Sequence, residues 1–224
     1  MDWPAIVLSL RLATATTLVL LVVGLPLAGW LALSQRRGRW AVDAVVALPL
    51  VLPPTVLGFY VLVALGPRSP IGRAYEAITG STIVFSFEGL LVASVLYSLP
   101  FAVQPFAAAF AAVDRNLIET AWCLGASRVR TFTRVVIPLA RPGIIAGVVL
   151  SFAHTVGEFG VVLMVGGNLP GTTRTVSISI YDDVQAFDYA RAGRTAALLL
   201  AFSFIVLAMT YRLQRRSGLV DRIG

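Results

Sequence analysis

The sequence predicts an all-α membrane protein with about five transmembrane helices. Of its 224 residues, 58% are hydrophobic and only 13% are charged, whereas soluble domains carry about 25% charged residues. The apolar residues also form runs long enough to cross a bilayer core, which takes ~20 residues in a helix. A soluble enzyme and a soluble DNA-binding domain are therefore not expected.

Five apolar runs are expected to span the membrane within one transmembrane domain that covers residues 1–224. The expected spans are residues 6–33, 42–65, 83–113, 143–165 and 192–211. The first run has no basic residue before it and is longer than a signal-peptide core, so we expect it to be retained. Prolines in the second and third spans predict kinks, which membrane helices tolerate where neighbours or a water-filled path satisfy the freed carbonyl groups. They are Pro49, Pro53, Pro54, Pro100 and Pro105.

The basic residues predict the orientation of the spans. All 18 are arginine, and 12 of them lie after the first span, between the third and fourth spans, or in the C-terminal tail that ends with Arg222. The positive-inside rule places these three segments in the cytoplasm. The N-terminus is therefore expected outside and the C-terminus inside the cell. This role also accounts for the net charge of +7 without a nucleic-acid partner.

The composition leaves little room for catalysis or a cofactor. A single cysteine, Cys123, and a single histidine, His154, exclude an intrachain disulfide and a Cys/His zinc site. No phosphate-binding GxxxxGK[ST] motif occurs, so the chain itself is not expected to bind ATP. An intramembrane enzyme and an ion channel are the alternatives from other classes. The first lacks a nucleophile-elbow pattern around Ser151, and the second lacks a filter-like repeat.

Residues 114–141, between the third and fourth spans, carry the most informative pattern. They have mixed polarity in a chain with otherwise short loops, and Gly125 suits the end of a helix. The pattern indicates a short helix-turn-helix that docks on a cytoplasmic partner; a helix lying on the lipid surface is the alternative. The residues spaced for its apolar side are Leu117, Ala121, Leu124 and Val129, with the aromatic residues Trp122 and Phe132 beside them.

This segment resembles the EAA motif of ABC-importer permeases, which reads E-A-A-x3-G-x9-I-x-L-P. The matching positions are Glu119, Thr120, Ala121, Gly125, Val135, Ile137 and Pro138, with Thr120 in place of the central alanine. The resemblance implies the type I ABC-importer permease fold, without enzymatic activity of its own. It also implies that residues 114–141 form a coupling loop and that these seven residues couple the permease to a separate cytoplasmic ATPase subunit.

Two further stretches, residues 48–62 and 157–181, resemble molybdate-importer permeases, with related sequences in sulfate permeases. The run from Gly167 to Thr175 fits the molybdate branch better. The resemblance implies an oxyanion substrate, most simply molybdate, with tungstate and sulfate or thiosulfate as alternatives. The implied partners are cytoplasmic ABC ATPase subunits, a periplasmic oxyanion-binding protein, a second copy of this chain and the lipid of a bacterial inner membrane.

Four polar residues of the fourth span are candidates for the translocation path or its gate. Ionisable groups inside a membrane are costly and favour a functional explanation, but a hydrogen-bonded cluster that packs helices together is an equally simple interpretation. An acidic side chain is an unusual ligand for an anion, so Glu158 is expected to act in gating or packing. The four residues are Ser151, His154, Thr155 and Glu158.

Overall fold

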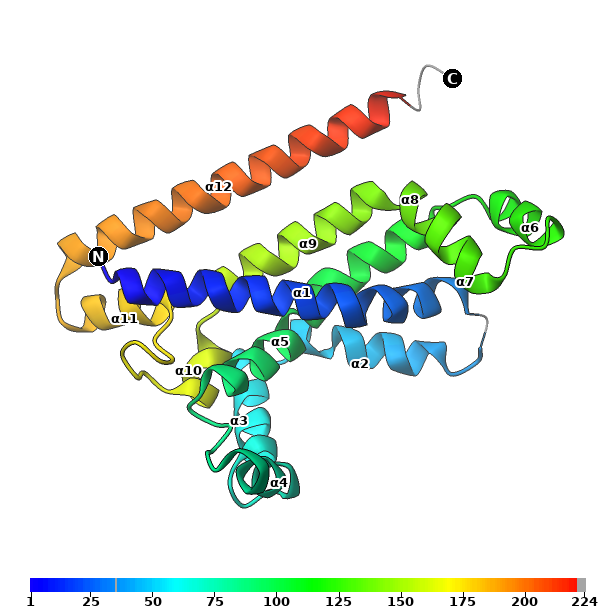
Figure 1. Cartoon of the computed structure of the whole chain (residues 1–224). Helices are drawn as coiled ribbons and strands as arrows, with labels where there is room; N and C mark the ends of the chain where they lie inside the picture. The colour runs from blue at the N-terminus through cyan, green and yellow to red at the C-terminus, as the bar shows by residue number, and fades with distance from the viewer. Residues whose placement is uncertain (35, 221–224) are drawn as a thin grey trace.

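Long helices run side by side through the molecule, and shorter helices lie at their ends (Figure 1). The computed structural model describes residues 1–34 and 36–220. Arg222 of the C-terminal tail lies outside the described residues. Among those described, there is no β-strand, in agreement with the expected all-α class.

The first helix, α1 (Trp3–Leu33), is a single uninterrupted element. Its N-terminus is capped by Asp2, whose carboxylate accepts a hydrogen bond from the backbone N–H of Ala5 at 3.1 Å. A helix of 31 residues is ~46 Å long, which exceeds a ~30 Å bilayer core. One or both ends of α1 therefore reach beyond the hydrocarbon layer unless the helix is strongly tilted.

The centre of the bundle is formed by α1, α5 (Phe87–Ala111) and α9 (Arg141–Val156), which pack against one another. Their shared core includes Phe106 and Phe110, both fully buried. The close approach of α9 to α5 requires glycine at position 147, because a Cβ there would lie 2.5 Å from Cε1 of Phe106. Tight packing of α5 on α9 fixes the positions of the polar residues that they carry.

The expected second span is divided into two helices, α2 (Arg39–Val51) and α3 (Pro54–Leu65), that meet at 113°. Leu52 and Pro53 each precede a proline, which disfavours helical backbone, and both are extended with ψ near 136° and 135°. The prediction of a kink in the second span is confirmed, and the structure shows how large the change of direction is. Helix α4 (Pro70–Thr79) follows α3 and lies across its end (Figure 1).

The expected fourth span also differs from the structure. Helix α9 ends at Val156, and α10 (Gly160–Gly166) begins after a break at residues 157–159. At the other end of α9, the helical segment of residues 128–139 meets it at 77°. Pro142 in the first turn of α9 suits a helix start, where its missing N–H has no intrahelical partner to lose.

The chain closes with α11 (Val176–Gln185) and α12 (Tyr189–Val220). Helix α12 packs on α11 and α9 along the edge of the bundle (Figure 1). It leaves large apolar side chains exposed, among them Leu200, Phe204 and Met209. Among the described residues, three helices can cross a membrane by length and composition, and five crossings result if each of the two bent pairs is one span. This agrees with the expected number.

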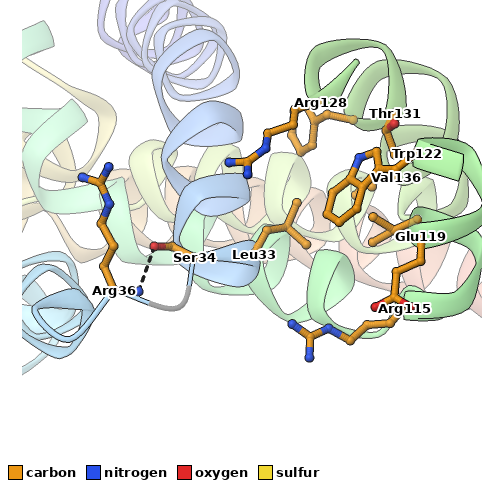
Figure 2. A pocket seen from close by; sticks show the side chains of 11 residues that line it. Leu33, Ser34, Arg36, Arg115, Glu119, Trp122, Arg128, Thr131 and Val136 are labelled. Carbon is orange, nitrogen blue, oxygen red and sulfur yellow. Dashed lines mark hydrogen bonds between the residues drawn. The ribbon is translucent and has the colours of Figure 1, made fainter. Parts of the chain in front are cut away.

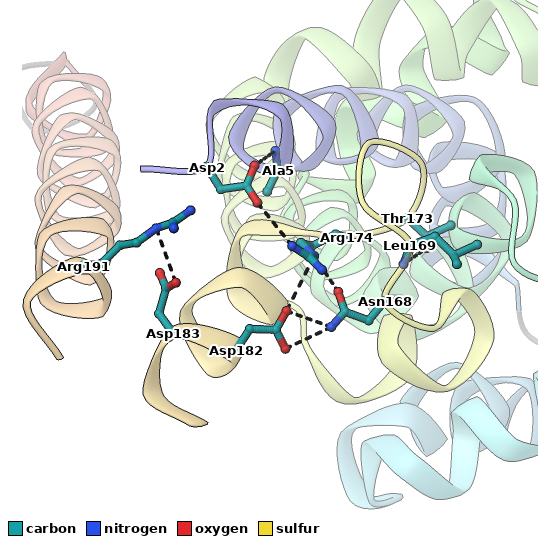
Figure 3. A network of polar contacts seen from close by, with 9 residues as sticks. All are labelled: Asp2, Ala5, Asn168, Leu169, Thr173, Arg174, Asp182, Asp183 and Arg191. Carbon is teal, nitrogen blue, oxygen red and sulfur yellow. Dashed lines mark hydrogen bonds and ion pairs between the residues drawn. The ribbon is translucent and has the colours of Figure 1, made fainter. Parts of the chain in front are cut away.

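A polar network ties the N-terminus to the loop before α11 (Figure 3). The guanidinium of Arg174 donates from Nε to Oδ1 of Asn168 at 2.6 Å and forms ion pairs with Asp182 at 3.6 Å and Asp2 at 3.9 Å. Asn168 in turn donates to both carboxylate oxygens of Asp182. Arg174 is therefore held by partners within the chain.

Candidate functional sites

The connection between α5 and α9 forms the helix-turn-helix that the sequence predicts. Helix α6 (Arg115–Cys123) starts at Asp114, whose carboxylate accepts from the backbone N–H of Asn116 at 2.9 Å. It ends in a Schellman turn, in which Gly125 donates to Trp122 O and Ala126 donates to Ala121 O, each at 2.9 Å. The φ of Gly125 is +82°, a conformation that residues with a Cβ rarely adopt. The motif glycine thus sets the direction in which the chain leaves α6.

The second helical segment contains a π-helical turn. It comprises α7 (Arg128–Thr131), η1 (Phe132–Val136) and α8 (Ile137–Leu139). The backbone N–H of Ile137 donates to Phe132 O, five residues back. The π turn lies directly before Pro138, which has no N–H to donate. The motif proline therefore lies where a departure from regular α-helix is already present.

The seven predicted coupling residues fall into two groups. Glu119, Thr120 and Gly125 are exposed on α6 and its turn, with Ala121 partly buried. Val135, Ile137 and Pro138 are partly buried, and Ile137 packs against the central core. The first group is available to a partner, whereas the second group joins α6 to the bundle.

Helix α6 presents apolar side chains to its surroundings rather than to the bundle. Leu124 is 82% exposed and Val129, at the start of the next helix, is 73% exposed. Leu117 is also exposed, whereas Ile118 on the opposite side of α6 is buried. We call Leu117, Leu124 and Val129 the apolar α6 surface. Exposed apolar residues near a turn of fixed geometry suit contact with another protein.

A cavity of about 650 Å³ lies on the other side of α6, between that helix, α7 and the end of α1 (Figure 2). We call it the α6 cavity. Glu119 lies on this side, together with three arginines. Its lining residues are Leu33, Ser34, Arg36, Arg115, Ile118, Glu119, Trp122, Arg128, Thr131, Phe132 and Val136.

The two breaks in the spans meet at a second cavity of about 580 Å³, which we call the junction cavity. The start of α3 touches the start of α10, since a Cβ on Gly160 would lie 2.8 Å from Cβ of Pro54. Discontinuous membrane helices are a common way to build a transport site, because unwound backbone lines a cavity there. The lining residues are Pro54, Thr55, Tyr97, Ala153, His154, Gly157, Glu158, Phe159 and Gly160.

The structure brings two of the four candidate path residues, His154 and Thr155, onto a contact between α9 and α5. Ser98 of α5 shares hydrogen bonds with His154 Nδ1 at 3.0 Å and with Thr155 Oγ1 at 2.9 Å. Ser151 is fully buried, and its hydroxyl donates to Val148 O. The His154 ring stacks on Phe101, with 3.8 Å between ring centroids. Thr155 therefore joins α9 to α5, Ser151 bonds within α9, and His154 both joins the two helices and lines the junction cavity.

Glu158 differs from these residues because its carboxyl group forms no hydrogen bond of regular geometry with a described residue, although the Ser94 hydroxyl of α5 lies near it. Its side chain lies in the break between α9 and α10, is only 4% exposed and lines the junction cavity. Neither carboxylate oxygen has a hydrogen-bond partner in the described part of the chain. A buried carboxyl group with few hydrogen bonds is costly, so its presence at this cavity favours a role there.

Sequence reasoning missed the α5 side of this cluster. Tyr97, Ser98 and Phe101 surround His154 but belong to the third expected span. The available signal was the pair of polar residues in the stretch Tyr97-Ser98-Leu99-Pro100, inside an otherwise apolar run. The pairing of this stretch with α9 depends on how the helices pack, which the sequence pattern does not give.

These features define a membrane transport subunit with a helical segment suited to a partner. The chain belongs to the family described as binding-protein-dependent transport system inner membrane component, whose profile matches residues 21–217. It is a transport permease and not an enzyme. The fold agrees with this assignment: a methionine ABC transporter solved in inward-facing conformations, MetNI, has a chain with a TM-score of 0.73 and 16% identity, covering 95% of this chain and 94% of that one.

Within the family, the chain is similar to molybdenum transport permeases. It is 54% identical over 219 residues to the molybdenum transport system permease protein ModB of Azotobacter vinelandii, covering 97% of both chains. A probable sulfate transport system permease protein, cysT, of Chlorokybus atmophyticus is 33% identical over 201 residues, covering 90% of this chain and 70% of that one.

Proposed function

We propose that the chain is the membrane-spanning subunit of an ATP-driven importer for molybdate. The observation that carries this proposal is the 54% identity to a molybdenum transport permease along 97% of both chains. A sulfate permease is the second candidate because several relatives bear that name, but at only 32–33% identity. Tungstate, an oxyanion of similar chemistry, is the alternative substrate within the first class.

A cytoplasmic ATPase subunit would dock on α6. The apolar α6 surface and the fixed turn at Gly125 support this role. Together they give α6 a defined orientation and exposed apolar side chains that a partner can cover. Thr120, Ala121 and Gly125 would lie at or beside the contact, and Glu119, which lines the α6 cavity, would lie at its edge. Val135, Ile137 and Pro138 would transmit a movement of α6 to α9 through the continuous helical segment of residues 128–139.

The oxyanion would pass near the junction cavity. Two interrupted spans meet there, and the N-terminus of α3, which carries partial positive charge from the helix dipole, lies at its wall. His154 and Glu158 would act at the gate. Thr155 would hold α9 against α5 so that the gate residues keep their positions, and Ser151 would support this part of α9 from within the helix.

Two copies of the chain would enclose the path. A single copy leaves the apolar face of α12 exposed and has one coupling segment, and twofold symmetry is the commonest arrangement of such subunits. A periplasmic oxyanion-binding protein would deliver the substrate to the end of the bundle that carries α4 and α11. In this assembly the N-terminus lies outside the bacterial inner membrane and the C-terminus lies in the cytoplasm.

Reporter fusions test the orientation. A reporter that works only in the cytoplasm is expected to be active when it is attached after Gly224. A reporter that works only in the periplasm is expected to be active when it is inserted after Gly171. The reverse pattern would overturn the proposed topology without affecting the family assignment.

Uptake by a reconstituted complex tests the transport function. Proteoliposomes that contain this chain and its ATPase subunit, supplied with binding protein, are expected to accumulate radiolabelled molybdate only when ATP is present. Accumulation of sulfate in preference to molybdate would instead support the second candidate.

A further inference from the structure

The α6 cavity combines a cationic rim with an apolar floor. Arg36, Arg115 and Arg128 lie around it in Figure 2, whereas Glu119 is its single acidic lining residue. None of the three arginines forms an ion pair with a described residue. The rim therefore carries a net charge of about +2 that nothing in the described chain neutralises.

The floor of the cavity belongs to the membrane bundle. Phe132 packs on Phe110 of α5, with 5.2 Å between ring centroids, and lies directly against Gly29 of α1. Val136 is fully buried in the central core. Leu33 joins the cavity to the exposed apolar side of α1, which also carries Val22 and Trp30. A hydrocarbon chain that lies along α1 would therefore stay in contact with apolar side chains as far as the cavity.

An unused hydrogen-bonding group also lines the cavity. Thr131 is only 2% exposed, and its hydroxyl has no hydrogen-bond partner among the described residues. Buried hydroxyl groups in proteins are normally paired. A buried hydroxyl that lines this cavity is suited to donate to an anionic oxygen bound there.

We propose that the α6 cavity binds the headgroup of an anionic phospholipid, with its phosphate on the arginines and Thr131 and an acyl chain against α1. The inference rests on the proposed orientation, which places α6 at the cytoplasmic surface. Basic pockets between membrane helices on that side bind anionic headgroups. The apolar α6 surface is separate, since Leu117, Leu124 and Val129 do not line the cavity. The same helix therefore carries lipid on one side and presents the other to the ATPase subunit.

Native mass spectrometry of the full-length chain measures this binding directly. In detergent supplemented with phosphatidylglycerol or phosphatidylcholine, the chain is expected to retain phosphatidylglycerol selectively. A basic residue near an anionic headgroup contributes about 1 kcal/mol to lipid binding. The single variants R36Q, R115Q and R128Q should therefore each weaken lipid retention about fivefold. The single variant T131V should also weaken it, because the hydroxyl is lost. R130Q/R134Q is the matched control, because it removes two arginines of the same segment that do not line the cavity.

Equal loss in the control and cavity variants would overturn the proposal, because it would indicate general attraction to a basic surface. Displacement of the lipid by millimolar phosphate or molybdate would also overturn the proposal, because it would show that the cavity is a site for free oxyanions. Displacement by the ATPase subunit would assign the cavity to the protein interface instead. Because the readout needs no transport, failure here leaves the proposed function intact, and failure of transport leaves this result intact.

Discussion

Single residues decide the geometry of the coupling segment, and Gly125 is the clearest case. Its φ of +82° and its place in the Schellman turn explain why the motif has glycine there. The sequence alone indicated a helix stop at this position, because glycine commonly follows the last turn of a helix. It did not indicate that Glu119 would face an arginine-lined cavity, because that depends on how α6 lies against α1.

Replacing Gly125 tests whether this turn positions α6 for the ATPase subunit. Proline fixes φ near −65°, so G125P is expected to abolish co-purification of the ATPase subunit while membrane insertion is retained. G125A should weaken co-purification of the ATPase subunit less than G125P does, because alanine at this φ costs only about 1 kcal/mol of strain. G38A is the control, since Gly38 is also open to solvent but has a φ of −89°. Normal assembly of G125P would contradict a docking role for the turn.

Glu158 provides a second test at this scale. Glutamine keeps the shape of the side chain but can neither carry a negative charge nor release a proton. Because its amide is about as polar as a neutral carboxyl group, E158Q is expected to change the free energy of unfolding by less than about 1 kcal/mol. Molybdate uptake should fall about tenfold, the effect of losing one interaction of ~1.4 kcal/mol in the gate.

The control for Glu158 is E88Q, which changes an exposed glutamate in the first turn of α5. E88Q should alter neither unfolding nor uptake. A lower unfolding temperature for E158Q would show that the carboxylate has a partner in the assembled protein. Unchanged uptake would remove Glu158 from the gate.

At the level of elements, apolar runs predicted where most helices lie but not how they break. The expected spans 6–33 and 83–113 correspond closely to α1 and α5 because each run is helical throughout most of its length. The run 42–65 is just as apolar, yet Pro53 and Pro54 turn it through 113°. The break at residues 157–159 has no proline, so hydropathy gave no sign of it. Its form depends on contact between α10 and α3.

Close contact between the two breaks makes Gly160 a sensitive position. An added Cβ would lie 2.8 Å from Cβ of Pro54, so G160A must separate α10 from the start of α3. We expect a loss of about 1–3 kcal/mol in the free energy of unfolding, as for other overpacked sites, and reduced uptake. G193A is the control, because Gly193 lies in α12 with open space around it and should tolerate alanine. Wild-type stability of G160A would mean that the two breaks are not tightly packed.

For the whole molecule, the fold and the family were predictable from the sequence, whereas the cavities were not. The EAA-like motif indicated an importer permease because its spacing extends over 20 residues, and the family assignment confirms that class. The α6 cavity and the junction cavity each combine residues from three or more elements. Such combinations arise from packing, which a pattern along one chain does not contain.

ATP hydrolysis by the complete complex tests the central claim most directly. The chain is co-purified with its ATPase subunit, reconstituted in lipid and supplied with the binding protein loaded with molybdate, tungstate or sulfate. An importer of the molybdate class predicts stimulation by the molybdate- and tungstate-loaded forms and none by the sulfate-loaded form. Stimulation by sulfate would move the chain to the sulfate permeases, and no stimulation by any oxyanion in an assembled complex would contradict the proposed substrate.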